Sequence, residues 1–300
     1  MKRSLLTFAI RLVLFLAAAS IASGQNNDVS KSSNPLVGTW KSLGPVDSNE
    51  KVNEAFQGQT TYETILEDGT FFALGFRKNF PKTGKNPTTL DEYNEIGENV
   101  FGQIAKYTLD TENNKIHVKY THNIRPASIG NEFTANFKVV GDTAFYWFDK
   151  GKRIHRWLRI SSDQNMIEST SSKPLIGTWM TLGAIDSTGK AVDFFKGQTA
   201  YSTFLEDGTH FGLGFRASFP QTGKNPSTLE EYEEIAKNIW GRMSTYTVDS
   251  EKKKSTMKNS YNFSPQGIGN EMTSNYEIVG DTLSVWFDRG KNRFQYLKVK

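Results

Sequence analysis

The sequence predicts an all-β protein in which one antiparallel domain, a sandwich or a barrel, occurs twice in tandem. Sliding the chain against itself matches Pro35–Trp40 to Pro174–Trp179, an offset of 179 − 40 = 139 residues. The same offset holds without a gap to the C-terminus, and roughly half of the paired positions are identical, which indicates a duplication. A hydrophobic share of 37% and a charged share of 23% are typical of a soluble globular protein.

The strands are predicted from short alternating runs that turn residues separate. Alternation of apolar and polar side chains is the pattern of a half-buried strand. Asp68-Gly69 and Asp207-Gly208 predict hairpin turns, because glycine supplies the positive φ that such a turn requires. Gly141-Asp142 and Lys150-Gly151 close two further hairpins. In the first copy the predicted strands cover 38–44, 58–66, 70–77, 102–109, 115–122, 131–140, 143–149 and 153–160.

One helix is predicted in each copy, after the third strand. Thr89-Leu-Asp-Glu92 and Thr228-Leu-Glu-Glu231 are capping boxes, in which threonine and glutamate side chains satisfy amides at the start of a helix. Gly102 stands where the first of these helices is expected to end. We expect the helix to dock on the strands and to cover one end of a barrel. Its apolar face consists of Leu90, Tyr93, Ile96 and Val100.

The N-terminal segment predicts a secretory signal peptide over residues 1–24. Basic residues precede an apolar run over 12–21, and small residues follow it. Cleavage after Gly24 would remove Lys2, Arg3 and Arg11, so the net charge would fall to +4 − 3 = +1. The mature protein is then expected to be periplasmic or secreted, with a disordered segment over 25–34, one domain over 35–160, a Ser-rich linker over 161–173 and a second domain over 174–300.

Several classes of protein are excluded by the same counts. A mature charge near zero removes the basic-patch argument for a nucleic-acid partner. A second apolar stretch of membrane-spanning length is absent from the sequence, so no integral membrane span is expected. The chain has no cysteine, so a lipoprotein anchor, a disulfide and thiolate metal ligands are all excluded.

Recurring short motifs give a resemblance to a known family. Each copy opens with Gly-x-Trp, at 38–40 and 177–179, and the first copy continues with Tyr107-Thr-Leu-Asp, Tyr120-Thr-His-Asn and Val140-Gly-Asp-Thr. With about eight antiparallel strands in roughly 125 residues, each copy resembles a calycin barrel of the lipocalin kind. The chain is also similar to uncharacterised lipocalin-like domains exported by Bacteroidetes. The resemblance implies two tandem up-and-down lipocalin-like barrels, each with a ligand cavity.

The same resemblance implies how the floor of each barrel is built. In lipocalins the tryptophan of Gly-x-Trp closes the floor, and a basic residue of the last strand packs over it with cation–π character. Here Trp40 would pair with Arg159 or Arg156, and Trp179 with Lys298 or Arg293. Lysine at 298 stands where the first copy has Arg159, so weaker stacking is expected in the second copy.

The two copies also differ in a way that suggests a site. Thr60, Tyr62, Thr64 and Leu66 are unchanged at alternate positions of their strand, whereas Thr61, Glu63 and Ile65 vary. Because alternate residues share one face of a strand, one face is constrained in chemistry. We expect the retained faces to line the cavities and to bind a small, partly apolar, lipid-like ligand. The expected ligand-binding residues are Tyr62, Phe72, Phe76, Tyr120, His122, Glu132, Asn136, Trp147, Tyr201, Phe211, Phe215, Tyr261, Glu271, Asn275 and Trp286.

A repeated loop adds a possible portal to each cavity. The stretch Phe72–Glu95 is the most repeated part of the chain, and unchanged surface loops are a functional hint. Arg77, Lys85, Arg216 and Lys224 could meet an acidic ligand group there. Alternatively, glycine and proline simply fix the turn and the helix plugs the barrel.

Catalysis, a cofactor and a metal are not expected. The four histidines His117, His122, His155 and His210 are not shared between the copies, and none has a zinc-ligand spacing. The sequence lacks a Gly-x-Ser-x-Gly elbow and a Walker loop. The favoured function is a non-catalytic ligand-binding protein, and the alternative is a surface module that binds glycan or protein through exposed aromatics. The oligomeric state stays open.

Overall fold

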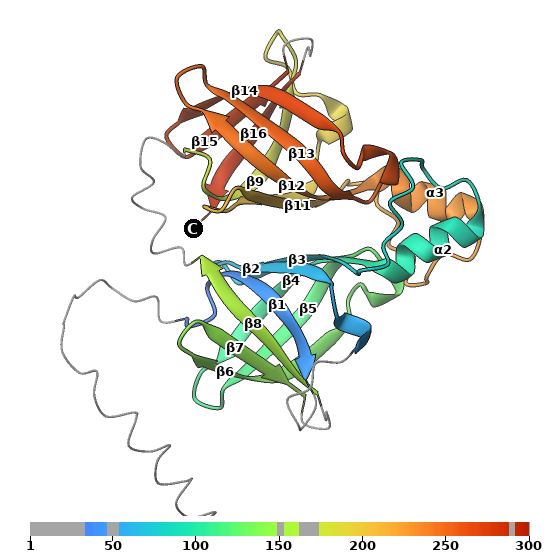
Figure 1. Cartoon of the computed structure of the whole chain (residues 1–300), viewed down its shortest axis with the longest axis vertical. Helices are drawn as coiled ribbons and strands as arrows, with labels where there is room; N and C mark the ends of the chain where they lie inside the picture. Colours follow the sequence, from blue (N-terminus) through green and yellow to red (C-terminus); the bar gives the residue numbers. More distant parts are fainter. Residues whose placement is uncertain (1–33, 47–53, 149–152, 162–173, 288–291, 300) are drawn as a thin grey trace, which may run out of the picture. The chain divides into compact units, whose positions relative to one another are not determined.

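The computed structural model describes residues 34–46, 54–148, 153–161, 174–287 and 292–299, which form two closed, eight-stranded antiparallel barrels (Figure 1). This confirms the predicted fold class, including one helix in each barrel. The predicted signal peptide, the linker apart from Ser161, the 25–34 segment apart from Asn34, and the Lys150-Gly151 turn lie outside the described residues.

Barrel 1 follows the chain order, with each strand pairing with the next and the last strand closing on the first. Trp40 and Arg159 are register partners at this closure. Its elements are β1 (Gly38–Val46), η1 (Glu54–Phe56), β2 (Thr60–Ile65), β3 (Thr70–Phe76), α2 (Leu90–Asn99), β4 (Val100–Asp110), β5 (Lys115–Asn123), η2 (Pro126–Ser128), β6 (Glu132–Val140), β7 (Thr143–Trp147) and β8 (Ile154–Ser161).

Barrel 2 repeats this plan and closes through the pairing of β16 with β9. Its elements are β9 (Gly177–Ile185), η4 (Asp193–Phe195), β10 (Thr199–Phe204), β11 (Thr209–Phe215), α3 (Leu229–Asn238), β12 (Ile239–Asp249), β13 (Lys254–Asn262), η5 (Pro265–Gly267), β14 (Glu271–Val279), β15 (Thr282–Trp286) and β16 (Arg293–Val299).

The local turn and capping predictions are confirmed. Gly69 and Gly208 adopt φ values of 78° and 85° in their hairpins, a region that glycine enters without steric cost. The Thr89 side chain accepts from the Glu92 amide, and the Glu92 carboxylate accepts from the Thr89 amide in return. The second capping box, at Thr228, has the same arrangement. Short-range chemistry of the sequence therefore fixes these boundaries.

The prediction for Gly102 is wrong. Helix α2 ends at Asn99, and Gly102 lies inside strand β4 rather than at the helix terminus. A Cβ atom at Gly102 would lie 3.0 Å from a methyl group of Leu213. Close side-chain packing against the strand, and not a helix cap, accounts for this glycine.

The floor of each barrel is built as the resemblance implied. Trp40 is fully buried, its indole nitrogen donates to the Leu36 carbonyl at 2.7 Å, and the Arg159 guanidinium lies 4.1 Å from its ring centre. In barrel 2 the Lys298 ammonium lies 5.5 Å from the ring centre of Trp179. The longer distance agrees with the weaker stacking expected of lysine.

Strands β2, β3, β10 and β11 are buried on both of their faces, apart from half-buried residues at some strand starts. One face points into the barrel that contains the strand. The other face joins a single apolar layer built from both repeats, here called the shared cluster. The shared cluster includes Tyr62, Phe72, Leu74 and Phe76 from barrel 1, and Tyr201, Phe211, Leu213 and Phe215 from barrel 2.

Symmetry-like ring contacts hold the shared cluster together. The rings of Tyr62 and Phe211 stack with centres 5.1 Å apart, and those of Phe72 and Tyr201 stack at 5.2 Å. Beside them the hydroxyl groups of Thr64 and Thr203, which occupy equivalent positions in the two repeats, form a buried hydrogen bond of 3.2 Å. Both repeats therefore contribute the same residues to one layer.

Two inward-facing glycines provide a test of the packing inside the barrels. A Cβ atom at Gly75 would overlap the Phe101 ring, and one at Gly214 would overlap the Trp240 indole. We expect Gly75→Ala and Gly214→Ala each to lower the free energy of unfolding by about 1–3 kcal/mol, because overpacking forces side chains out of their rotamers. Urea unfolding of the chain measures the change.

The matched control is Gly97→Ala in helix α2, where a Cβ atom would have open space. This substitution is expected to raise the free energy of unfolding by up to ~1 kcal/mol, because alanine is the better helix former. Equal effects of the three substitutions would contradict the packing described here.

Candidate functional site

Most of the residues expected to line the cavities lie outside the lumens. Tyr62, Phe72, Phe76, Tyr201, Phe211 and Phe215 belong to the shared cluster. Tyr261 joins them, with its ring 4.9 Å from that of Phe76, and the His122 ring lies 5.2 Å from that of Phe215. The expectation that this retained face lines a cavity is wrong in placement. The face is constrained because each repeat packs the same residues against the other.

A second group of expected residues lies on the outer surface of β6, β7, β14 and β15. Glu132 is exposed and pairs with Lys119 at 2.7 Å, which lowers the pKa of its carboxyl group. Ala135 and Phe137 are buried in the barrel 1 core, so Asn136 between them points outward, together with its register partner Trp147. Glu271, Asn275 and Trp286 occupy the same outward positions in barrel 2.

Tyr120 is the residue of the predicted set that the structure places in a lumen. It packs against the barrel 1 core, and its ring centre lies 5.5 Å from that of Phe133. The other residues named for ligand binding are divided between the shared cluster and the outer strands, so the structure does not bring the predicted set together.

The predicted portal residues lie around a loop whose conformation is held by hydrogen bonds within the loop. The Thr83 hydroxyl donates to the Lys85 carbonyl at 2.9 Å and accepts from the Lys85 amide at 3.3 Å, and Thr222 does the same with Lys224. Arg77, Lys85 and Lys224 are exposed, and the Arg216 guanidinium lies 3.6 Å from the ring centre of Phe194. Buried Phe80 and Phe219 pack edge-on against the shared cluster, which accounts for the repetition of this region.

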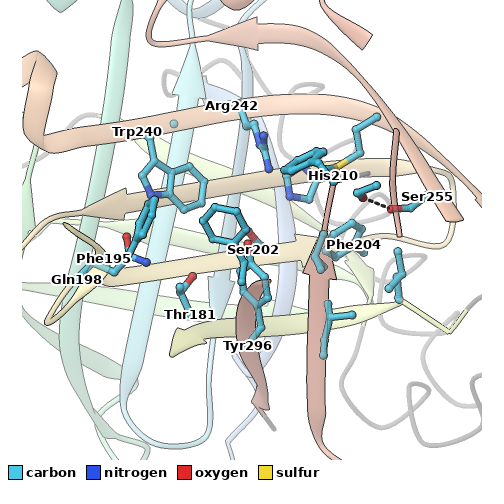
Figure 2. Close-up of a pocket in the computed structure, with 18 of the residues that line it drawn as sticks. Thr181, Phe195, Gln198, Ser202, Phe204, His210, Trp240, Arg242, Ser255 and Tyr296 are labelled. Atoms are coloured by element: carbon cyan, nitrogen blue, oxygen red, sulfur yellow. Dashed lines mark hydrogen bonds between the residues drawn. The ribbon is translucent and has the colours of Figure 1, made fainter. Parts of the chain in front are cut away.

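A cavity of about 260 Å³ occupies the lumen of barrel 2 (Figure 2). By strand register, Phe195, Gln198 and Trp240 lie toward the end where β10 and β12 begin. Phe204, Met257 and Leu283 lie toward the Trp179 floor. Polar groups occur between and beside these apolar walls, namely Thr181, Ser202, His210, Arg242, Ser255, Ser274 and Tyr296.

Three of these polar groups are buried without the partners that buried polar atoms normally have. Both ring nitrogens of His210, the Nε atom of Arg242 and the hydroxyl of Thr181 have no hydrogen-bond partner within the part of the chain that the structure describes. The Arg242 side chain lies between Trp240 and His210 in the close-up (Figure 2). A guanidinium stays charged in proteins, so this lumen holds a buried positive charge.

Burial also changes the proton affinities of these groups. Desolvation lowers the pKa of His210 well below its ordinary value, and the positive charge of Arg242 adds to the effect. The imidazole is therefore neutral at neutral pH. Burial raises the pKa of the Tyr296 phenol, although the positive charge of Arg242 opposes this shift. The Tyr296 hydroxyl is therefore protonated at neutral pH. The lumen presents one cation and several neutral hydrogen-bonding groups.

Arg242 lies on a cross-strand row with two small residues. Gly212 is the register partner of both Arg242 and Ser202, so the three residues form one cross-strand row. A Cβ atom at Gly212 would lie 2.7 Å from the Ser202 hydroxyl and 3.0 Å from the Trp240 ring. The absence of a side chain at Gly212 therefore leaves space for the Ser202 hydroxyl and the Trp240 ring.

The equivalent row in barrel 1 contains an acidic residue instead of a basic one. Its members are Glu63, Ala73 and Gln103, which pair in the same register. The Glu63 side chain is buried, and its Oε1 atom has no hydrogen-bond partner among the described residues. Burial raises the pKa of Glu63 from 4.5 to about 8, so the carboxyl group is largely protonated at neutral pH.

Sequence comparison of the repeats contained a signal for these residues. Glu63 corresponds to Ser202, Gln103 to Arg242 and Phe71 to His210, so these polar groups stand where the repeats differ. The retained positions are structural, and the variable positions of the same strands face the lumens. The residues retained between the repeats therefore do not indicate the candidate site.

Among the residues with described structure, no three histidine, aspartate or glutamate side chains form a group that could hold a metal ion. None of the helices in this part of the chain has the length and hydropathy needed to cross a membrane.

Comparison with known proteins gives distant likenesses. No family model matches the chain, and no curated protein matches it. A DUF4847 family protein from Bacteroides vulgatus has 12% identity over 41% of this chain and 92% of its own, with a TM-score of 0.26. A Schistosoma mansoni fatty acid binding protein in complex with arachidonic acid has 16% identity over 44% of this chain and 100% of its own, with a TM-score of 0.24.

A third solved structure matches over both barrels. It is a protein of unknown function from the DUF3598 family of Nostoc punctiforme, with 12% identity over 88% of this chain and 96% of its own and a TM-score of 0.22. The site described above therefore rests on the residues of this chain alone.

The raised pKa of Glu63 predicts a pH dependence of stability. Between about pH 4.5 and pH 8 the unfolded chain ionises Glu63 while the folded chain keeps its proton, so stability falls as pH rises through this window. Glu63→Gln removes this loss. The difference in the free energy of unfolding between the variant and wild type should grow in favour of the variant by on the order of a few kcal/mol between these pH limits. It should not change further above about pH 8. Thermal and urea unfolding across the range measure it, and a pH-independent difference would contradict the buried carboxyl.

The unpartnered imidazole of barrel 2 predicts a dependence of opposite sign. His210→Phe introduces the residue that barrel 1 has at Phe71, and it removes two buried nitrogens without partners in the described structure. We expect higher stability than wild type, with a gap that widens below about pH 6.5, because only the unfolded chain protonates His210 there. The melting temperature at several pH values measures the gap. A less stable variant at every pH would argue against the described environment of His210.

Proposed function

We propose that this chain is an exported, non-catalytic binding protein that holds a small, partly apolar ligand with an anionic group in the lumen of barrel 2. The observation that carries the proposal is Arg242, whose buried Nε atom has no hydrogen-bond partner among the described residues, beside a cavity of about 260 Å³. A guanidinium matches the geometry of a carboxylate or phosphate, to which it donates two parallel hydrogen bonds. Apolar walls on either side of Arg242 suit the remainder of such a ligand.

The energetics favour an anionic occupant. A buried charge without a counter-ion is costly, and removing one partner from a buried pair typically leaves a large penalty. A bound anion would offset the cost of burying Arg242, and the neutral His210, the Thr181 hydroxyl and the Tyr296 phenol could donate further hydrogen bonds to it. A ligand without charge would leave Arg242 uncompensated, so the site is expected to discriminate by charge.

The volume sets the size of the ligand. At about 30 Å³ for each water-sized group, 260 Å³ holds roughly nine non-hydrogen atoms. Heptanoate has this size, and heptanamide is its uncharged counterpart of the same shape. The two compounds therefore separate recognition of charge from simple filling of an apolar cavity.

The proposal predicts the effect of Arg242→Gln, which introduces the residue that barrel 1 has at Gln103. Isothermal titration of the mature chain with heptanoate should show binding that the variant weakens by ~10–100-fold, since hydrogen bonds to charged groups are worth about 1.5–3 kcal/mol. Wild type should bind heptanamide more weakly than heptanoate. The variant should bind the two compounds with similar affinity.

The matched control is Asn275→Leu, which changes an outward position of the same barrel. It should leave the affinity for heptanoate unchanged. Failure of wild type to bind heptanoate, or equal binding by wild type and Arg242→Gln, would overturn the proposal.

The alternative of a surface module for glycan or protein loses part of its support. The retained aromatic pairs at Tyr62, Phe72, Phe76 and Phe80 are buried in the shared cluster, whereas the retained pair Trp147 and Trp286 points outward. Among the large apolar side chains exposed in the described ranges, Phe194 is covered on one side by Arg216.

A further inference from the structure

The inner faces of the two barrels have diverged around one cross-strand row. In barrel 2 the row combines a basic residue on β12 with a small neutral one on β10, and in barrel 1 it combines an acidic residue on β2 with a neutral one on β4. Glu63 and Arg242 therefore stand on the same row of the two repeats, with opposite charge types. A shared structural role would require a shared residue, as at the Trp40 and Trp179 floors.

We propose that the lumen of barrel 1 is a second binding site, which takes a small primary ammonium compound that pairs with the carboxylate of Glu63. This assignment goes beyond the anion site of barrel 2 and does not depend on it. The two sites would make one chain a carrier of two ligands of opposite charge.

Buried acceptors in barrel 1 match an ammonium group. The Oε1 atom of Glu63, the hydroxyl of Thr61 and the hydroxyl of Tyr146 are buried, and none of them has a hydrogen-bond partner in the described ranges. Thr61 and Glu63 are alternate residues of β2 and so share its inner face. An ammonium group offers three donors and no acceptor, which suits such a set of oxygen atoms.

Aromatic side chains accompany these oxygens. Tyr120, Tyr146, Phe101 and Trp157 all belong to the barrel 1 core or pack against it. Burial raises the pKa of both Tyr120 and Tyr146, and the charge of ionised Glu63 adds to the shift, which places the two phenols near the carboxyl group. Aromatic rings around a cation add attraction that an anionic ligand would not receive. The aromatic rings therefore favour a cationic partner over an anionic one.

Proton balance gives the proposal a specific signature. Glu63 is largely protonated in the folded chain at pH 7, because burial raises its pKa to about 8. An alkylammonium ion enters already charged, so formation of the ion pair moves the carboxyl proton to the buffer. Binding of one ammonium ion should then release close to one proton.

The experiment is isothermal titration of the mature chain with propylammonium chloride at pH 7, in two buffers of different ionisation enthalpy. Wild type should bind the ion saturably and release about one proton for each ion bound. Glu63→Gln should weaken binding by at least ~10-fold and abolish the proton release. Uncharged 1-propanol, which has the same size, should bind more weakly than the ammonium ion.

Controls separate this site from the site in barrel 2 and from misfolding. Asn136→Leu, an outward position of barrel 1, should bind propylammonium as wild type does. The folding of Glu63→Gln is checked by its melting temperature, which should not fall below that of wild type at pH 7. A parallel titration with heptanoate reports on barrel 2 independently.

The outcomes are distinct for the two proposals. Heptanoate binding without propylammonium binding would overturn the barrel 1 assignment alone. Propylammonium binding that is equal in wild type and Glu63→Gln, or that releases no proton, would also overturn it. Propylammonium binding with the stated proton release would support it even if heptanoate does not bind.

Discussion

The burial of two opposite strand faces is the constraint on which the rest of the structure depends. Every residue of β3 is buried, and β11 differs only at its first residue, although both are ordinary barrel strands with one inner and one outer face. The outer faces meet in the shared cluster, where Tyr62 stacks on Phe211 and Phe72 on Tyr201. Because each repeat supplies the same rings to this layer, a change in one repeat would disturb packing against the other.

The inner faces are under a different constraint. The floor must be closed, and Trp40 and Trp179 do this in both barrels. Above the floor, the lumen residues are free of the pairing between repeats, and Glu63 and Arg242 each stand where the other repeat has a neutral residue. Buried groups of this kind cost stability and are expected where a ligand completes them. Duplication thus offers one scaffold with two independently adjustable lumens.

Local rules of the sequence predicted most of the fold. Alternating runs, Asp-Gly turns and the Thr89 capping box lie close to the observed strands, hairpins and helix start, because each depends on residues near one another in the chain. The candidate site depended on which side of a strand faces inward. Alternation separates Tyr62 from Glu63 but gives no sign of which one is inside when both faces are buried. The residues retained between the repeats are those under the tighter packing constraint. Only the closed barrels show that Glu63, His210 and Arg242 face the lumens.

The most direct test of the central claim is a crystal structure of the mature chain with 7-bromoheptanoate, in which anomalous scattering locates the bromine. The account predicts bromine density inside the lumen of barrel 2, with the carboxylate on the Arg242 guanidinium. Bromine on the outer face of β14 and β15, beside Asn275 and Trp286, or a carboxylate distant from Arg242, would contradict the assignment of the inner, diverged face as the binding face.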